Sequence, residues 1–458
     1  MKWLKQWSYP QLFVILALGF GFRLVFLNPP WHTNDEDRHF YNAYHLAQGH
    51  LGPDVKDSLC GYVMPVSLYE EVRRFQVIPY GEKAKLVPEQ IDDISEKPLE
   101  PERNKFFATP STKLPPFAYL PSAIMIKAGS FLHDSPVWLN WWGRIGSLLA
   151  YILIVFYAFK ILPLFRPLLF MIALSPMALY QSASVSYDGL SLAFLFLFFA
   201  FVLHYYHREN PIGWKEIFIL FAVAFFQRFS KDGYFPLYFC AAFIPFSRFQ
   251  NRVIYFSMIG LLLVASFLPA WLWSAYLSSQ HLPAELPLQK DYAFDMGKNL
   301  AFHLSDPLRA VKLLVLNSLS QGRVWIQGAI GRFGFSYTSL PLWFTVIQLM
   351  MMGLVTMTEP REKSISPRFQ GALIALSFIN ITAIILLFFL SITPIGGYYL
   401  HGMQGRYFTP ILPFLFAGLF YIPGFPVQWK NLKWITAGYC AVMLFYTLDF
   451  IHQFYYSA

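Results

Sequence analysis

The sequence predicts an all-α polytopic membrane protein, and three features of its composition lead to that fold class. Apolar residues make up 56% of the 458 residues and charged residues only 13%, whereas soluble proteins carry about 25% charged residues. Apolar runs long enough to cross about 30 Å of hydrocarbon recur along the chain. Aromatic residues reach 19%, as expected where Trp and Tyr line both membrane interfaces. We therefore expect one transmembrane domain over residues 1–458, with about 11 spans and a range of 10–13.

The N-terminal part predicts one span followed by a large outer loop. Lys2 and Lys5 place the N-terminus inside by the positive-inside rule. A span at about 10–28 then delivers the residues after it to the outer face. Residues 29–141 form the first outer loop, which is polar, often rich in proline, and expected to carry interfacial helices. One such helix is expected at 115–131, where three prolines and a lysine interrupt an apolar run.

Ten further spans and a second outer loop complete the predicted topology. The second outer loop covers residues 277–339 and is also expected to carry interfacial helices. Lys and Arg gather at the span ends that this order places on the inner face, as the positive-inside rule requires. With eleven spans and an inner N-terminus, the C-terminus lies outside. The net charge of +9 is explained by Lys and Arg in the short inner loops, which lie near anionic lipid. We therefore expect membrane lipids and no nucleic acid as partners. The spans are expected near 142–162, 167–183, 188–206, 214–229, 234–246, 253–276, 341–357, 370–391, 406–422 and 434–453.

The stretch WHTNDEDRHF at residues 31–40 concentrates polar groups directly after the first span. One interpretation is a helix start. Thr33 and Glu36 match the capping-box pattern, and the aspartates on either side of Glu36 would sit in the first turn, where the positive helix end favours carboxylates. Gly49 would end this helix.

A second interpretation of the same stretch is chemical. On a helix Asp35 and His39 are four residues apart and share one face. A carboxylate beside an imidazole can accept a proton from a hydroxyl group or hold a metal ion. Three acids within three residues also exceed what capping requires. The two interpretations are compatible, because a helix N-terminus is a good place to fix a catalytic carboxylate.

The run Asp35-Glu36-x-x-His39-Phe40, with Tyr44 and Gly49, resembles the PDE-x-x-H-F signature of a bacterial integral-membrane family of unknown function. That family is placed in the GT-C glycosyltransferase superfamily. Two departures stand out: Asn34 replaces a proline, and Phe335-Ser336 stands where a Leu-Asp pair is expected, which puts an acid of the later outer loop in doubt. Further matching stretches follow in order at Pro115-Pro116 with Tyr119, Arg144, Ser175-Pro176, residues 182–188, Ser230-Lys231, and residues 404–407 with Pro410.

The resemblance implies a GT-C-like helical bundle that transfers a sugar from a polyprenyl-phosphate donor to an envelope glycan or glycolipid acceptor. The reaction would take place on the outer, periplasmic face of a bacterial inner membrane. A carboxylate after the first span would act as general base, usually with inversion at the anomeric carbon. Asp35 matches that position best and Glu36 next, with His39 on the same helix face.

The leaving lipid phosphate needs positive charge, so cations at the outer ends of spans are candidate ligands. They are Arg406, Lys231 and Arg144. Each could equally be an interface anchor whose charged end reaches water. Weaker candidates for substrate contacts are Asp37, Asp188, Tyr407 and Gln404, and Asp188 could instead cap a helix after Ser186.

A metal requirement is left open by the sequence. Asp35-x-Asp37 could hold a divalent cation, Mg²⁺ or Mn²⁺, together with a donor phosphate. Four histidines also invite a metal hypothesis, although polar groups at the interface explain most of them. They are His32, His39, His45 and His50. No other cofactor is indicated.

Two rival functions remain. An envelope polysaccharide polymerase or ligase would draw on arginines of the second outer loop, such as Arg323 and Arg332, but this leaves the Asp35–His39 cluster unexplained. A lipid-linked sugar transporter or flippase would be expected to show repeated halves and charges at the midplane. No repeat is visible, and the charges gather at span ends, which favours the transferase.

Overall fold

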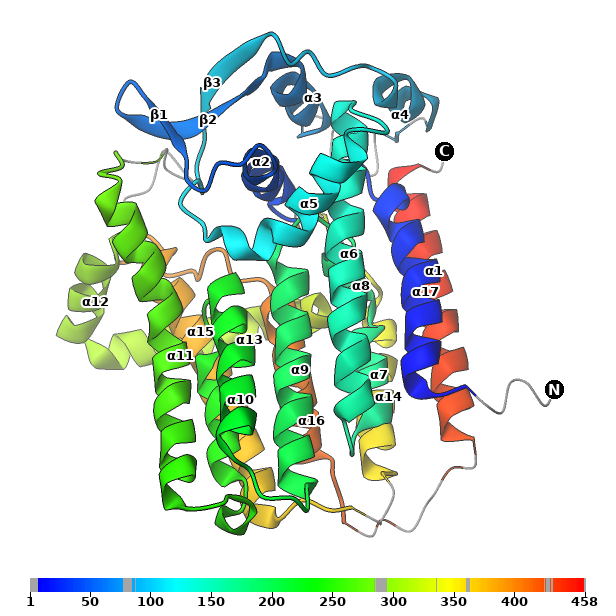
Figure 1. Ribbon diagram of the computed structural model, residues 1–458, viewed down its shortest axis with the longest axis vertical. Coiled ribbons are helices and arrows are strands. Elements are labelled where there is room, and N and C mark those ends of the chain that lie inside the picture. The colour runs from blue at the N-terminus through cyan, green and yellow to red at the C-terminus, as the bar shows by residue number, and fades with distance from the viewer. Residues whose placement is uncertain are drawn as a thin grey trace.

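The chain folds into a mostly helical body with a small cap of mixed structure at one end (Figure 1). The long helices run up and down the body, and the cap gathers at the upper end in this view. The structure is a computed structural model. It describes residues 7–76, 85–86, 88–283, 285, 295–334, 336–359, 363–423, 425, 429 and 431–456.

Six helices of the described residues are long and apolar enough to cross a membrane. The predicted spans at their positions are confirmed as helices, whereas the total of 11 spans stays a prediction. The six are α1 (Tyr9–Leu27), α6 (Pro136–Ile161), α9 (Tyr187–His207), α11 (Arg252–Ser279), α15 (Pro367–Ser391) and α17 (Leu432–Tyr455). Two shorter helices, α10 (Trp214–Ser230) and α14 (Leu342–Met357), also lie where spans were expected.

Three of the expected spans are not continuous α-helices, and prolines interrupt each of these segments. Pro176 disfavours helical backbone at Ser175, so 167–183 divides there, and the Ser175 hydroxyl caps the second piece by accepting from the Ala178 N–H. The other two segments contain 3₁₀ turns. The resulting elements are α7 (Arg166–Ala173), α8 (Pro176–Ser182), η3 (Phe235–Phe243), η4 (Phe246–Arg248), η5 (Gly405–Ile411) and α16 (Leu412–Leu419).

The first predicted outer loop builds the cap, and here the expectation of an all-α fold is wrong. Three strands form an antiparallel sheet in the order β1-β2-β3. Asp57 and Ser58 both have positive φ, which is the backbone of a two-residue hairpin turn. The pairing of Lys56 with Leu59 across that turn sets the register. The cap elements are α2 (Glu36–Ala47), β1 (Asp54–Lys56), β2 (Leu59–Pro65), α3 (Val66–Gln76), α4 (Pro88–Ser95), β3 (Asn104–Ala108), η2 (Pro116–Tyr119) and α5 (Leu120–Gly129).

The second predicted outer loop, 277–339, is largely helical where it is described. It contains α12 (Met296–Ser305), the 25-residue α13 (Pro307–Gly331), and the short strands β4 (Arg332–Phe333) and β5 (Thr338–Ser339). Because α13 packs against η5 and α8, this segment is part of the body. The helices expected in it are therefore present.

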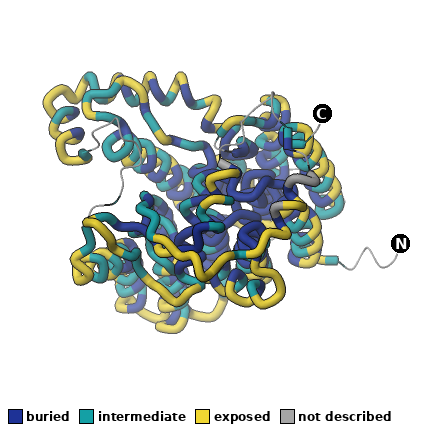
Figure 2. Tube along the Cα trace, turned by 90° about the horizontal axis from the view of Figure 1, so that it is seen from above, coloured by how far each residue is buried: buried dark blue, intermediate teal, exposed yellow. Residues whose placement is uncertain are grey.

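The central helix of the body is α9. Of its most apolar 18-residue window, 89% is buried, against 28% for α15. Seen from above, buried residues fill the middle of the molecule and exposed residues form its rim (Figure 2). The N-terminus of α9 therefore brings its first residues into the centre, beneath the cap.

The described chain begins at the lower end of α1 and finishes at the upper end of α17 (Figure 1). Helices α1 and α17 pack side by side and both run upward in Figure 1. This matches an N-terminus and a C-terminus on opposite faces. Which face points outward stays a prediction.

Candidate functional site

The entry to α2 places Asp35 outside the helix. Asp35 has left-handed backbone, with φ at 57°, and α2 begins at Glu36. The Glu36 carboxylate reaches back to Thr33 and accepts from its hydroxyl at 2.8 Å and from its N–H at 3.3 Å. The Thr33–Glu36 contact is therefore present, but Thr33 is not the N-cap that the capping-box pattern predicts. Gly49, with φ at 93°, follows the end of the helix as expected.

Glu36 and Arg144 form an ion pair with no exposed side-chain surface. Glu36 Oε2 lies 2.6 Å from Arg144 Nη2, and Glu36 Oε1 lies 2.7 Å from Arg144 Nε. The rest of the guanidinium donates to the carbonyl oxygens of Val25, Asn28 and Pro29. All five N–H groups of Arg144 thus have partners inside the protein. Arg144 has no donor left for a phosphate.

This pair ties together segments that lie far apart in the sequence. The guanidinium on α6 holds the end of α1 through three carbonyls, and Glu36 also accepts from the Val185 N–H, just before α9, at 3.0 Å. Burial opposes ionisation of Glu36, but the charge of Arg144 outweighs it and lowers the pKa of the carboxyl. The pair fixes where Asp35 sits relative to the N-terminus of α9.

A second charged network lies next to the first and contains Asp35, Asp188, Lys231 and Arg406. Arg406 Nη2 donates to Asp35 Oδ2 at 3.1 Å. Arg406 Nε lies 3.3 Å from Asp188 Oδ2, and the other oxygen of Asp188 pairs with Lys231. These four residues come from the entry to α2, the first turn of α9, the residue after α10, and η5. We call this set the outer charge cluster, after the face of the membrane on which the sequence predicts these residues to lie.

Asp35 is the acid of the outer charge cluster that reaches solvent. Its side chain is 32% exposed, against 10% for Asp188. Arg38 lies 3.6 Å from the second Asp35 oxygen. Burial raises the pKa of Asp35, but Arg406, His39 and Arg38 together outweigh that effect and lower it. Asp35 is therefore ionised at neutral pH.

His39 lies beside this acid and is buried. Its Nδ1 is 2.7 Å from the Tyr119 hydroxyl, and its Nε2 has no hydrogen-bond partner among the described residues. Burial lowers the pKa of His39 to about 4, although Asp35 and Asp188 work in the other direction. The imidazole is therefore neutral at pH 7 and can accept or relay a proton.

Aromatic rings enclose the inner end of the cluster. Lys231 Nζ lies 4.6 Å from the centre of the Tyr187 ring and 4.3 Å from that of Tyr407. The Tyr234 hydroxyl donates to the Tyr407 carbonyl and holds η5 in place. Cation–π contacts of this kind stabilise a lysine charge that is removed from water.

A cavity of about 440 Å³ opens at this point. One part of its wall is polar and includes Lys231, Tyr187 and Tyr407. The wall also includes Lys113, Arg228 and Asp232, and much of its apolar part comes from the C-terminal halves of α11 and α15. The cavity thus joins a cationic end to an apolar wall, which is the pattern that a charged headgroup on a lipid chain requires.

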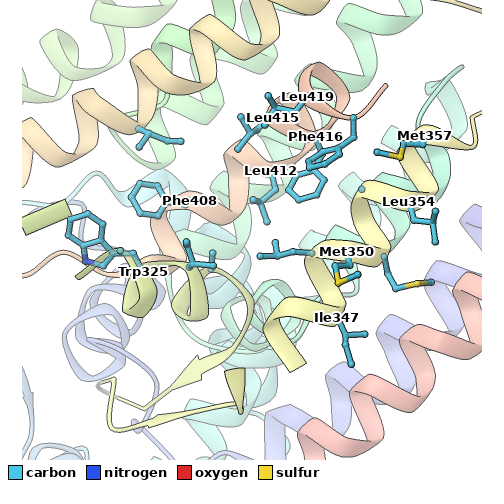
Figure 3. Close-up of a pocket in the computed structure, with 18 of the residues that line it drawn as sticks. Trp325, Ile347, Met350, Leu354, Met357, Phe408, Leu412, Leu415, Phe416 and Leu419 are labelled. Atoms are coloured by element: carbon cyan, nitrogen blue, oxygen red, sulfur yellow. The ribbon is translucent and has the colours of Figure 1, made fainter. Parts of the chain in front are cut away.

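A larger groove of about 900 Å³ lies on the other side of η5 (Figure 3). Its walls come from α13, α14 and α16, and labelled residues such as Trp325, Met350 and Phe416 point into it. Among the residues that the structure describes, no charged side chain lines this groove. It offers no partner for a phosphate, so the smaller cavity is the better candidate site.

A family model described as "Predicted membrane protein (DUF2142)" matches residues 18–415 of the chain. The chain belongs to this family. The match includes every candidate residue from Asp35 to Arg406, and it confirms the resemblance to a membrane-protein family. No curated protein and no solved structure matches the chain. Membership of the GT-C superfamily stays a proposal for this DUF2142 protein.

The structure brings together most, but not all, of the predicted site residues. Gln404 lies at the edge of the cluster, where it accepts from the Asn34 amide at 2.9 Å. Asp37 is a buried residue of α2. Among the described residues Asp35 and Asp37 belong to no cluster of three metal-ligand side chains. Asp188 does not cap α9 as the alternative interpretation expected. Ser186 is the N-cap, and its hydroxyl accepts from the N–H of Asp188, which lies in the first turn of the helix. Phe335 lies outside the described residues.

Two aromatic residues of the site were missed by sequence reasoning. Tyr187 and Tyr234 contact Lys231 and η5, respectively. Their only signal was proximity: Tyr187 precedes Asp188, and Tyr234 follows Lys231 by three residues. In a chain with 27 tyrosines, that proximity does not single them out.

Proposed function

We propose that this DUF2142 protein is a GT-C-type glycosyltransferase of the bacterial inner membrane. It transfers a sugar from a polyprenyl-phosphate donor to a glycan or glycolipid acceptor on the outer face. The observation that carries the proposal is the position of Asp35. It is an ionised, partly exposed carboxylate fixed against Arg406. Through Arg406 and Asp188 it belongs to the same charged network as Lys231, which lines a cavity with a cationic end and an apolar wall.

In this proposal Asp35 removes the proton from an acceptor hydroxyl as its oxygen attacks the anomeric carbon. The bond between that carbon and the phosphate oxygen breaks, and the polyprenyl phosphate leaves with the bonding electrons. A general base of this kind contributes a factor of about 10²–10⁴ to the rate. Arg406 Nη2 donates a hydrogen bond to Asp35. The acceptor hydroxyl must displace part of this contact to reach the carboxylate.

The charges around the cavity suit the leaving group. In the network beside the cavity, Arg38, Arg406 and Lys231 supply three cations against the two carboxylates Asp35 and Asp188. The cavity wall adds Lys113 and Arg228 against the single carboxylate Asp232. With His39 neutral, the positive charges outnumber the negative ones, which favours binding of the donor phosphate. Nη1 of Arg406 has no hydrogen-bond partner among the described residues and is therefore a candidate ligand for a phosphate oxygen. Arg144 and Glu36, which saturate each other, are left out of the reacting set.

The test is sugar transfer by purified protein in lipid vesicles, with a panel of polyprenyl-phosphate sugars and envelope acceptors. We expect Asp35→Asn to lower the transfer rate by about 10²-fold or more while the melting temperature holds. The matched control is Asp57→Asn, which changes an exposed aspartate in the β1–β2 turn and should transfer at the wild-type rate.

The same vesicles distinguish the rival functions. A flippase moves the lipid-linked sugar between leaflets without consuming it, whereas a transferase or polymerase releases the free carrier phosphate. A polymerase would further give products that grow with time. Full transfer by Asp35→Asn would contradict the proposed base.

A further inference from the structure

A second group of chemically active side chains lies at the far end of α2. His45 is in the last turn of α2, His50 follows Gly49, and Asp54 begins β1. One nitrogen from each imidazole and one carboxylate oxygen lie within 4.8 Å of one another. The two imidazole rings stack with their centres 4.6 Å apart. Among the described residues this is the one group of three or more His, Cys, Asp or Glu with such spacing.

The hydrogen bonds around His45 leave one nitrogen available. His45 Nε2 lies 2.8 Å from the Gly52 carbonyl oxygen. A carbonyl only accepts, so Nε2 carries the proton and Nδ1 presents a bare lone pair. That lone-pair atom lies 3.9 Å from Asp54 Oδ2. An imidazole held in one tautomer by a backbone carbonyl is the usual arrangement of a histidine metal ligand.

Asp54 is oriented in the same manner. Its Oδ2 accepts from the Val63 N–H at 2.7 Å, which fixes the carboxylate against β2. The 3.9 Å gap to His45 is too long for a hydrogen bond. Two ligands bound to one tetrahedral zinc at about 2.1 Å lie about 3.4 Å apart. A small rotation of the side chains closes that difference.

We propose that His45, His50 and Asp54 bind a divalent transition metal, with Zn²⁺ as the best match. Two imidazoles and one carboxylate suit Zn²⁺, whereas Mg²⁺ and Ca²⁺ prefer oxygen ligands alone. The group borders a cleft of about 360 Å³ that His50 and Asp54 help to line. That cleft leaves room for water at a fourth position.

The metal would act on the position of α2 rather than on the proposed reaction. Asp35 precedes His45 by ten residues, which corresponds to about 15 Å along a helix. The ion would join the end of α2 to β1 and so fasten the helix that carries His39. Zinc binding at this site does not depend on the proposed transferase activity, so each can fail alone.

The test uses the full chain in detergent, purified with an affinity tag that contains no histidine and stripped with a chelator. Zn²⁺ is titrated against a chromophoric competitor, and the melting temperature is followed at saturating zinc. We expect one zinc ion per chain and a rise in melting temperature, because a ligand that binds only the folded state stabilises it.

His50→Ala and Asp54→Asn should each weaken zinc binding by at least about tenfold, which is the smallest effect usually seen even for residues that only support a ligand. His50 is exposed, so its replacement should leave folding intact. His133→Ala, an exposed histidine elsewhere, is the matched control and should bind like wild type. Equal binding by all four proteins, or no saturable binding by wild type, would overturn the proposal.

Discussion

At the scale of single residues, the two neighbouring acids Asp35 and Glu36 have opposite environments. Glu36 has no exposed side-chain surface and is matched to Arg144, whereas Asp35 is 32% exposed and shares Arg406 with Asp188. Left-handed backbone at Asp35 turns it away from the helix that Glu36 begins. One acid therefore holds the structure together, and the other is available for chemistry.

This difference predicts distinct consequences for the two amide substitutions. Glu36→Gln leaves the Arg144 charge buried and unpaired, and loss of one partner of a buried ion pair costs about 3–5 kcal/mol. We expect a lower melting temperature in detergent. Asp35→Asn, at a partly exposed position, should change the melting temperature little. The same substitution should strongly lower the rate of sugar transfer.

The measurement is thermal unfolding and sugar transfer on the same preparations. A Glu36→Gln protein that melts like wild type and fails to transfer would place Glu36 among the reacting groups. That outcome would support Glu36 as the general base, the role for which the family resemblance makes it the second candidate after Asp35.

At the scale of elements, the site depends on a close approach between η5 and α13. A Cβ atom on Gly405 would lie 2.0 Å from the Trp325 carbonyl oxygen and 2.6 Å from Gly328 Cα. Backbone atoms cannot move aside as a flexible side chain can. Glycine at this position therefore sets the place of the next residue, Arg406.

Gly405→Ala should push η5 away from α13 and disturb the contacts of Arg406 with Asp35 and Asp188. We expect a lower melting temperature and a transfer rate below that of the wild-type protein. Gly371→Ala in α15 is the matched control, because its Cβ would meet no atom within 4 Å, and alanine favours a helix by about 1 kcal/mol. Wild-type transfer by Gly405→Ala would show that the contact is not needed.

The sequence predicted the individual charged residues better than their pairing. Asp35, Lys231 and Arg406 were each singled out, and the structure places them in one network. Local spacing reports contacts within a helix, but Glu36 and Arg144 are 108 residues apart. Nothing in either neighbourhood indicates that Arg144 is saturated by Glu36 rather than open to a phosphate.

The elements that sequence reasoning missed are short or interrupted. Strand β1 has three residues, too few for an alternating pattern to be visible. The segments around η3 and η5 have the apolar composition of spans, and composition alone does not report that prolines and 3₁₀ turns replace continuous helix there. Long apolar helices such as α9 and α15 were predicted well because length and composition suffice for them.

At the scale of the whole molecule, the cap and the outer charge cluster share one end of the body. The loop between α9 and α10 lies at the opposite end (Figure 1). The proposed reaction requires the cap to face the periplasm, since the polyprenyl-phosphate donor is used on the outer leaflet. Orientation is therefore a direct test of the proposal at this scale.

Cysteine labelling in intact cells measures that orientation. The native cysteines Cys60, Cys240 and Cys440 are all buried, so background labelling should be low. Glu102→Cys in the cap and Glu209→Cys between α9 and α10 each place one thiol at an exposed position. We expect a membrane-impermeant maleimide to label Glu102→Cys in cells whose outer membrane alone is permeable. Glu209→Cys should be labelled only after the inner membrane is opened, because its end of the body carries the inner positive charge. The reverse pattern would put the outer charge cluster in the cytoplasm and exclude a periplasmic transfer reaction.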